Sequence, residues 1–355
     1  MAKMKIAVFL PNWLGDVAMA TPVLRALRKQ YGEDACIVGI MRPYLHETLD
    51  GTDWLDDRWN LLPKSVDYRE RRIEVARRMR RAEFDLAVLL TNSISTAAIA
   101  WYGRAKRRIG YARYGRAPLL TDPIIMPRHG RHVVEEPMVD YYLRIAERLG
   151  CTDLSQKTEL VTTRQERRSA EAVWENLGLR TDGRVILFNS SGAYGGTKLW
   201  PVEHFAELAR RVVGELDHDV LVMCGPNERE TARTIVDLSR SERVFSMADQ
   251  PLGIGTAKAC MERGRLMVST DSGPRHVAAA LGKPVITMYG PMLPIWSENP
   301  TQRAIHLYEP LDCIGCHKRV CPLGTLQCMK DLSVDRVFDS VVQLMCEEAV
   351  PARVA

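Results

Sequence analysis

The residues best suited to chemistry form the turn Thr270-Asp271-Ser272-Gly273-Pro274-Arg275-His276, between an apolar run and an alanine-rich stretch. Polar capping residues followed by proline predict that a helix begins here, directly after a strand. A helix start binds anions, and the amides of Ser272 and Gly273 would face a diphosphate. His276 could donate to a phosphate oxygen, whereas Asp271 is expected to bind a hydroxyl, a water or the helix amides.

A second loop, from Ser190 to Pro201, also has the composition of an anion site. It contains three glycines, among them Gly192, and several hydroxyls, among them Ser191. Its backbone N–H groups could approach an anion closely, and Lys198 would add a positive charge. The spacing does not match a Walker A motif, and a flexible surface loop explains the composition equally well.

Two acidic residues follow predicted strands. Asp16 comes after the first strand and either caps the next helix or acts as a general base for an acceptor hydroxyl. Glu228 follows a later strand and either caps a helix or binds ribose hydroxyls. Gly15 stands without a G-x-G-x-x-G fingerprint, which argues against a nicotinamide enzyme.

Four cysteines, Cys313, Cys316, Cys321 and Cys328, lie close together near the C-terminus. They could close a tetrahedral structural Zn²⁺ site, with His317 as a substitute ligand. Iron–sulfur ligation is a second reading, although the spacing is not diagnostic. The third reading is that the cysteines are small buried residues that pack a loop-rich segment.

Length and charge limit the class of protein. The chain has 355 residues and a net charge of +5, with dense arginine at 104–108. Solvent-exposed helix faces, a phosphorylated substrate or a membrane surface would each explain the arginines, and no nucleic-acid-binding motif accompanies them. No apolar run reaches the length of a membrane span and no leader precedes the first strand, so a cytoplasmic protein is expected.

Apolar runs alternate with amphipathic stretches in two series, which predicts an α/β fold with two Rossmann-like domains. Expected domains are 1–155, 165–335 including the cysteine segment 313–328, and a C-terminal helix and tail at 336–355. Ligands of such sheets bind at the carboxyl ends of the strands. The expected strands are 5–10, 35–41, 84–90, 184–189, 219–224, 266–270 and 284–289, and the expected helices are near 17–31, 66–82, 141–149, 201–215, 227–240, 251–263 and 273–281.

Several of these stretches together resemble the family 9 glycosyltransferases, in particular the ADP-heptose:lipopolysaccharide heptosyltransferase II group. The resemblance is carried, in family order, by Asn12-Trp-Leu-Gly-Asp-Val-Ala-Met-Ala-Thr-Pro22, Lys198-Leu-Trp-Pro201, the segment 269–284 and Tyr289-Gly-Pro291. It implies a GT-B architecture whose two domains face an interdomain cleft, with acceptor bound by the first domain and nucleotide sugar by the second. It also implies an inverting transfer that requires no cofactor.

Position by position, the resemblance assigns Asp16 as catalytic base. It assigns donor binding to Ser191, Gly192, Lys198, Glu228, Thr270, Asp271, Ser272, Gly273 and His276. Arg275 departs from the family pattern and either adds a phosphate contact or points to solvent.

The implied reaction moves heptose from ADP-L-glycero-D-manno-heptose to the inner core of lipopolysaccharide. The implied acceptor is a lipid A-core oligosaccharide, whose phosphates Arg104 to Arg108 and Arg113 could read, and the enzyme would contact the cytoplasmic face of the inner membrane peripherally. A non-catalytic sugar-nucleotide-binding or scaffold protein and a GT-B nucleotide-sugar epimerase remain as alternatives.

Overall fold

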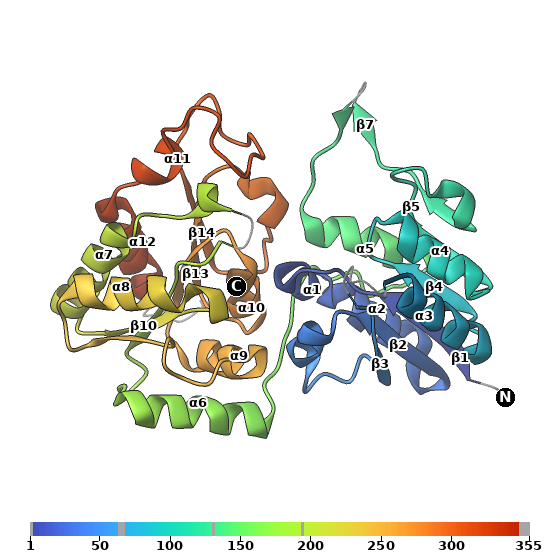
Figure 1. Cartoon of the computed structure of the whole chain (residues 1–355), viewed down its shortest axis with the longest axis horizontal. Helices are drawn as coiled ribbons and strands as arrows, with labels where there is room; N and C mark the ends of the chain where they lie inside the picture. The colour runs from blue at the N-terminus through green and yellow to red at the C-terminus, as the bar shows by residue number, and fades with distance from the viewer. Residues whose placement is uncertain (1–2, 63–67, 130–131, 193–194, 348–355) are drawn as a thin grey trace, which may run out of the picture. The chain divides into compact units, whose positions relative to one another are not determined.

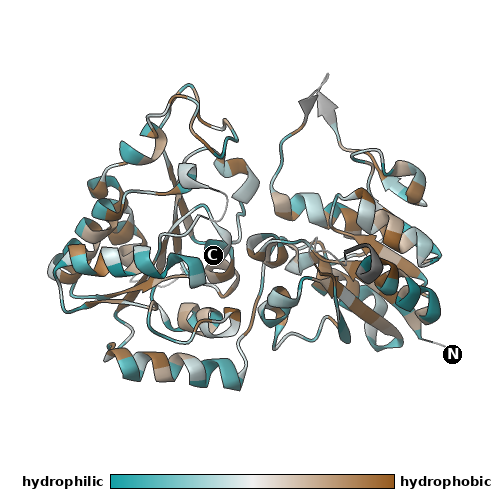
Figure 2. Ribbon diagram, viewed as in Figure 1, coloured by the Kyte–Doolittle hydropathy of each residue, from teal (hydrophilic) through white to brown (hydrophobic). Residues whose placement is uncertain are grey.

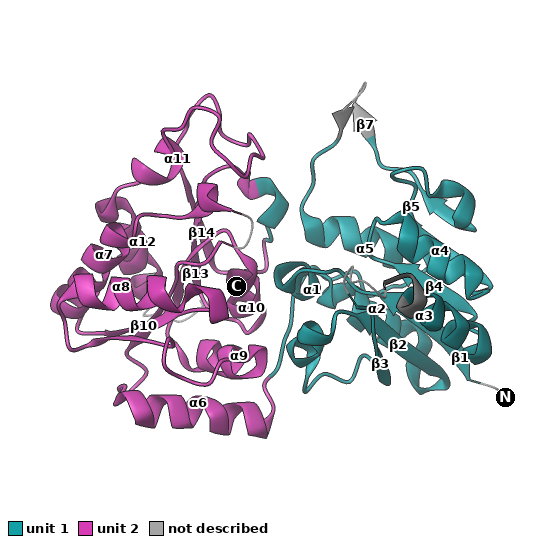
Figure 3. Cartoon of the chain, viewed as in Figure 1, with its two compact units in different colours: residues 1–161, 295–299 teal, residues 162–294, 300–355 magenta. Residues whose placement is uncertain are grey.

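The computed structural model describes residues 3–62, 68–129, 132–192 and 195–347 and divides into two compact units (Figure 3). The first unit comprises Met1–Val161 together with the short segment Ile295–Asn299, and the second comprises Thr162–Pro294 and Pro300–Ala355. The sequence did not predict that Ile295–Asn299 groups with the first unit. Within that unit, Asn299 Nδ2 donates to the carbonyl of Gln156 over 2.9 Å.

The first unit is built on a six-stranded sheet in the order β3-β2-β1-β4-β5-β6, with every neighbouring pair parallel (Figure 1). A separate two-stranded ribbon pairs β7 with β8. The strands are β1 (Met4–Phe9), β2 (Ala35–Met41), β3 (Asp57–Asn60), β4 (Leu86–Leu89), β5 (Arg107–Tyr111), β6 (Asp122–Ile124), β7 (Arg128–His129) and β8 (His132–Val133), and the helices are α1 (Leu14–Met19), α2 (Thr21–Tyr31), α3 (Tyr68–Ala82), α4 (Ile94–Tyr102) and α5 (Met138–Arg148).

The second unit repeats this topology with the order β11-β10-β9-β12-β13-β14, again wholly parallel. Both orders are the doubly wound order, which confirms the predicted pair of Rossmann-like α/β folds. The strands are β9 (Val185–Asn189), β10 (Asp219–Met223), β11 (Val244–Ser246), β12 (Met267–Thr270), β13 (Val285–Tyr289) and β14 (Ala304–Tyr308), and the helices are α6 (Arg164–Leu177), α7 (Val202–Leu216), α8 (Arg229–Ser239), α9 (Ile254–Arg263), α10 (Gly273–Ala280), α11 (Gln327–Lys330) and α12 (Val334–Glu347).

Burial explains why continuous apolar runs predicted the central strands. All five residues of β9, β10 and β13 are buried, as expected where helices cover both faces of a parallel sheet. Figure 2 shows strands of the sheets largely in brown, while the helices alternate brown and teal. No helix in the described part of the chain has the length and apolarity that crossing a bilayer demands.

Helix α6 begins at Arg164, in the linker between the expected domains 1–155 and 165–335, and it is not among the helices expected from the sequence. The Thr163 hydroxyl accepts from the amide of Glu166 over 3.2 Å, and the Glu166 carboxylate accepts from the amide of Thr163 over 2.7 Å. This reciprocal capping box fixes the start of the helix. The polar residues at the boundary are therefore capping residues as well as linker.

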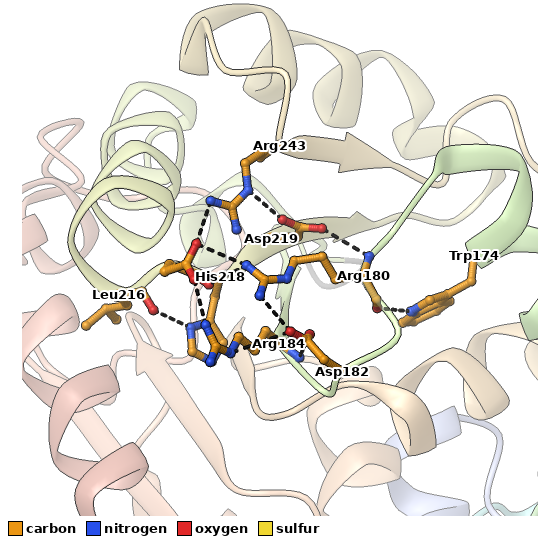
Figure 4. A network of polar contacts seen from close by, with 9 residues as sticks. Trp174, Arg180, Asp182, Arg184, Leu216, His218, Asp219 and Arg243 are labelled. Carbon is orange, nitrogen blue, oxygen red and sulfur yellow. Dashed lines mark hydrogen bonds and ion pairs between the residues drawn. The ribbon is translucent and has the colours of Figure 1, made fainter.

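A network of ion pairs closes the amino-terminal edge of the second sheet (Figure 4). Asp219, the buried first residue of β10, accepts from Arg243 Nε over 2.8 Å and from the amide of Arg180 over 3.2 Å. Asp217 pairs with Arg243, Arg180 and Arg184, and the first two lower the pKa of its carboxyl to about 2. These charges satisfy one another at this edge, so ligand chemistry is to be sought at the carboxyl ends of the strands.

Candidate functional site

The N-terminus of α10 carries no side-chain cap. Ser272 occupies the N-cap position in an extended conformation, yet its side chain makes no capping hydrogen bond. Instead its hydroxyl accepts from Asn189 Nδ2 over 2.8 Å, and the same amide group donates to Ser269 Oγ over 2.9 Å. Asn189, at the end of β9, thereby holds Ser272 away from the first-turn amides. Those amides are the groups with which a helix start binds an anion.

Lys198 and Asp271 form a buried ion pair beside this helix start. Lys198 Nζ lies 2.5 Å from Asp271 Oδ2 and 2.9 Å from the carbonyl oxygen of Asp271, and each residue is at most 9% exposed. The sequence predicted both residues at the site but not their pairing. The lysine neutralises a carboxylate that would otherwise repel a bound phosphate.

The glycine-rich loop is fastened to the same turn. The hydroxyl of Thr270, at the end of β12, donates to the carbonyl of Ser191, and both residues are buried. The carbonyl of Gly192 accepts from the amide of Gly195 over 3.0 Å, which folds the loop back toward Lys198. Ala193 and Tyr194, which belong to the predicted anion loop, lie outside the described residues.

Arg275 is fully buried, so the expectation that it points to solvent is wrong. Its Nε donates to Thr287 Oγ1 on β13 over 3.0 Å, and Nη1 lies 3.1 Å from His276 Nδ1. Because a guanidinium can only donate, Nδ1 must accept and the imidazole proton resides on Nε2. Burial, and then the charges of Arg275, Lys198 and His306, lower the pKa of His276 well below its usual value. His276 is therefore a neutral donor through Nε2 at physiological pH.

A second histidine nearby makes stability depend on pH. Burial, and then the charge of Arg275, lower the pKa of His306 to about 4, and its ring stacks on Tyr289 with 5.3 Å between centroids. In the unfolded chain a histidine has a pKa of about 6.5 and becomes protonated below that pH, whereas His306 in the folded protein stays neutral down to about pH 4. The folded state therefore loses stability relative to the unfolded state as the pH falls from about 6.5 to 4.

We expect wild type to lose about 2 kcal/mol more unfolding free energy between pH 7.5 and pH 5 than the variant His306→Gln. Urea unfolding at the two pH values measures the difference. Equal losses in both proteins would show that His306 does not titrate in this window.

Glu228 caps the turn that precedes α8. Its Oε2 accepts from the amide of Gly225 over 2.8 Å, whereas α8 itself has no side-chain cap. The expectation that Glu228 caps the following helix is therefore wrong in position, because the carboxylate turns back onto the residues that follow β10. Its second oxygen has no hydrogen-bond partner within the described residues, and Glu228 is partly exposed.

Asp16 lies in the first turn of α1, in the other unit. The N-cap of α1 is Trp13, whose side chain makes no capping hydrogen bond, so Asp16 is not the N-cap residue that the sequence suggested. The preceding loop is held by Asn12, whose side-chain oxygen accepts from Arg42 Nε over 2.9 Å and whose carbonyl accepts from the Tyr44 hydroxyl over 2.5 Å. This bracing fixes the position from which the Asp16 carboxylate projects.

Tyr142 on α5 also contacts Asp16. Its hydroxyl donates to Asp16 Oδ1 over 3.4 Å, and its ring is buried. Burial, and then the Asp16 charge, raise the pKa of Tyr142 well above its usual value, so the phenol stays protonated and remains a donor. The sequence gives no local signal for Tyr142, because its contact with Asp16 spans 126 residues.

With Asp16 as the catalytic base that the family resemblance implies, Tyr142→Phe should lower kcat about threefold to tenfold, since one long hydrogen bond that orients the carboxylate is lost. The ionised carboxylate also loses a donor, so the acid limb of the pH–rate profile should move to higher pH. Steady-state rates between pH 5 and 9 test this. A change in kcat with an unmoved acid limb would mean that Tyr142 only supports packing.

The cysteine segment packs against the glycine-rich loop. Thr197 Oγ1 donates to the carbonyl of Lys318 over 2.8 Å, and a Cβ added at Gly195 would lie 2.9 Å from the carbonyl oxygen of Arg319. All four cysteines of the segment are free thiols. The backbone N–H groups of residues 323–326 lower the pKa of Cys321, whereas burial, and then the other three cysteines, raise that of Cys328.

No group of three or more His, Cys, Asp or Glu side chains is arranged to hold a metal ion anywhere in the described ranges, which include residues 313–328. The zinc and iron–sulfur hypotheses therefore find no ligand set. The four cysteines are only partly buried, so the reading that they are small buried residues is wrong. The segment nevertheless packs beside the Lys198 loop through the backbone of Lys318 and Arg319.

The structure brings most of the predicted donor residues together in the second unit. Asn189 is a further member of this group that the sequence did not single out, and Arg275, for which a phosphate contact was one of two expectations, belongs to it as well. Asn189 could have been found from the sequence because it is a polar residue at the end of an otherwise apolar strand, Val185–Asn189. The hydrogen bonds and the ion pair described above join eight of the predicted residues, either directly or through a neighbour in the chain: Ser191, Gly192, Lys198, Thr270, Asp271, Ser272, Gly273 and His276.

Comparison with known proteins gives consistent matches over nearly the whole chain. The family model described as glycosyltransferase family 9 (heptosyltransferase) matches residues 72–327. Lipopolysaccharide heptosyltransferase 2 of Salmonella typhimurium is 25% identical over 98% of this chain and 100% of its own length. Lipooligosaccharide heptosyltransferase 2 of Campylobacter jejuni (serotype O:2) is 24% identical over 96% of this chain and 98% of its own.

Solved structures of the same kind share the fold. ADP-heptose lps heptosyltransferase II of E. coli superposes with a TM-score of 0.80 at 22% identity, over 98% of this chain and 100% of the other. A glycosyl transferase family 9 protein of Veillonella parvula superposes with a TM-score of 0.82 at 25% identity, over 98% and 99% of the two chains. The two parallel sheets described above are thus those of the GT-B fold.

Proposed function

Because the chain belongs to glycosyltransferase family 9, we propose that it transfers heptose from ADP-L-glycero-D-manno-heptose to the inner core of lipopolysaccharide. The observation that carries this proposal is the open helix start of α10 beside the Lys198–Asp271 pair, a site suited to a sugar-nucleotide diphosphate. The heptosyltransferase relatives match 98% of this chain, and their names support heptose as the sugar and lipopolysaccharide as the acceptor. Neither the scaffold nor the epimerase alternative has a specific observation in its favour.

The donor's diphosphate is bound by the amides of Ser272 and Gly273 at the start of α10. His276 donates to a phosphate oxygen through Nε2, and Lys198 offsets the charge that develops on the departing ADP. Thr270, Asp271, Ser191 and Gly192 shape this turn, while the carboxylate of Glu228 accepts from the ribose hydroxyls. No metal ion is required, because the helix start and the lysine supply the stabilising charge.

Asp16 is the general base of the proposed reaction. It takes the proton of the attacking acceptor hydroxyl as that oxygen bonds to the anomeric carbon and the bond to ADP breaks, which inverts the configuration. The anomeric carbon becomes oxocarbenium-like in this displacement. Tyr142 and the Asn12 loop orient the carboxylate for this role.

The acceptor is a lipid A-core oligosaccharide, bound by the first unit at the cytoplasmic face of the inner membrane. Several exposed basic and aromatic side chains of α4 and the loop after it suit contact with an anionic headgroup surface. They are Trp101, Tyr102, Arg104 and Lys106.

Donor choice tests the proposal before any acceptor is needed. Calorimetric titration of the protein with ADP-heptose, a GDP-sugar and a UDP-sugar should show ADP-heptose binding at least about tenfold more tightly than the other two. Equal affinity for all three would leave the diphosphate site but reject the assigned donor. Absence of binding by any sugar nucleotide would reject the transferase assignment.

A further inference from the structure

Two side chains that could cap α10 are both held away from it by buried partners. Asp271 and Ser272 stand directly before the helix, and aspartate and serine are favoured N-cap residues. The carboxylate of Asp271 pairs with Lys198 Nζ. The hydroxyl of Ser272 accepts from Asn189 Nδ2 over 2.8 Å. The proposed reaction uses Lys198, but no step of it uses Asn189.

The backbone of Ser272 already has the conformation of a capping residue. Its φ of −146° and ψ of 169° are extended, as is typical of an N-cap, so a rotation of the side chain would bring its hydroxyl to the helix amides. An N-cap side chain bonds to the amide of the second or third helical residue, and the second residue here is Pro274, which has no N–H. A Ser272 cap would therefore use the amide of Arg275 and place the serine oxygen over the helix start.

A second serine fixes the orientation of the Asn189 amide. Asn189 ends β9 and pairs with Ser269 of the neighbouring strand β12, and its Nδ2 lies 2.9 Å from Ser269 Oγ. Ser269 donates its single hydroxyl proton to the carbonyl of Thr270 over 2.6 Å, so it can only accept from the amide. Nδ2 therefore faces both serines and donates one proton to each. Asn189 and Ser269 are buried, so water does not compete for these bonds.

The bond from Asn189 determines what the Ser272 hydroxyl can do. Because Ser272 Oγ accepts from Nδ2, the hydroxyl keeps its own proton for donation to a phosphate oxygen. Turned onto the helix, the same oxygen would compete with the diphosphate for the helix start. A helix that has a capping residue but no cap departs from the local rule, and such departures are expected at functional sites.

We infer that Asn189 is a positioning residue of the diphosphate site, which keeps the start of α10 open by preventing Ser272 from capping it. The inference rests on the proposed function for the identity of the anion. In this role Asn189 acts only through Ser272 and makes no contact with the diphosphate. An N-cap typically shifts an equilibrium about fivefold, so a cap that must break before ADP binds should weaken ADP by about that factor.

A double-mutant cycle tests whether Asn189 acts through Ser272. Calorimetric titration with ADP is carried out on wild type, Asn189→Ala, Ser272→Ala and the double variant. We expect Asn189→Ala to bind ADP about fivefold more weakly than wild type, and the double variant to bind within about twofold of Ser272→Ala, because no hydroxyl is left to form the cap. Asn176→Ala removes an exposed asparagine of the same unit, whose amide contacts Gln250, and should bind ADP like wild type.

Amide hydrogen exchange tests the cap without any ligand. The first-turn amides of α10 should exchange more slowly in Asn189→Ala than in wild type, and the double variant should lose this added protection. Asn189→Val, whose β-branched side chain suits the end of a buried strand, replaces the alanine variant if that variant does not fold. Because no nucleotide is present, this measurement decides the inference even if wild type binds no ADP and the proposed function fails.

The inference is overturned if wild type binds ADP and Asn189→Ala binds it equally well. It is also overturned if the Asn189 substitution weakens ADP by the same factor with and without the Ser272 hydroxyl, which is what general support of the sheet would do. Exchange at the start of α10 that does not slow in Asn189→Ala would contradict the cap itself.

Discussion

Asp16→Asn is expected to lower kcat about 10³-fold and to leave donor affinity unchanged. A general base contributes about 10²- to 10⁴-fold, and the amide cannot take the acceptor proton. Asp16 lies in the first unit whereas the proposed diphosphate site lies in the second, so the loss should fall on turnover alone. Initial rates of ADP release at saturating acceptor, with calorimetric titration of ADP-heptose, measure both quantities.

The exposed acid Glu147 on α5 provides the matched control, since Glu147→Gln removes a carboxylate from the same unit away from Asp16. Its kcat should equal that of wild type. An Asp16→Asn enzyme with normal turnover would show that another group accepts the proton, and a large loss of donor affinity would place Asp16 in donor binding instead.

Lys198→Met should weaken ADP-heptose about 100-fold and cost about 3 kcal/mol of unfolding free energy. The first effect follows from losing a cation at the phosphates. The second follows because Asp271, only 8% exposed, would keep its carboxylate without the ammonium 2.5 Å away. Calorimetry and urea unfolding report the two effects separately.

The double variant Lys198→Met/Asp271→Asn separates phosphate binding from structural support. Removing both charges should restore most of the stability, while donor affinity should stay low. Recovery of donor affinity in the double variant would mean that Lys198 acts only by neutralising Asp271. Lys330→Met, an exposed lysine of the same unit, should change neither quantity.

The central strands could be predicted because each is buried on both faces and therefore apolar throughout. Edge strands and short strands could not be predicted in this way. For example, β5 begins with Arg107-Arg108 and β3 begins with Asp57-Arg58, and such charged residues form a strand only because they pair with a neighbouring strand. Helix α6 was missed because its polar cap was interpreted as linker. Local capping signals, by contrast, placed the start of α10 at Gly273, where the structure has it.

The candidate site likewise has a part that local sequence predicts and a part that depends on contacts between distant residues. The α10 turn is encoded in consecutive residues and was visible, whereas the Lys198–Asp271 contact joins residues 73 apart and depends on β9 and β12 being neighbours. The burial of Arg275 likewise depends on Thr287 of the adjacent strand β13. Sequence patterns can therefore name such groups, but the sheet order decides which of them meet.

Acceptor-dependent transfer tests the proposed function most directly. The protein is incubated with ADP-heptose and a lipid A-core acceptor that lacks the heptose, and both ADP and the acceptor mass are followed. We predict that ADP is released only when acceptor is present and that the acceptor gains the mass of one heptose per ADP. ADP release without acceptor, or donor binding with no product at all, would contradict the assignment as a heptosyltransferase.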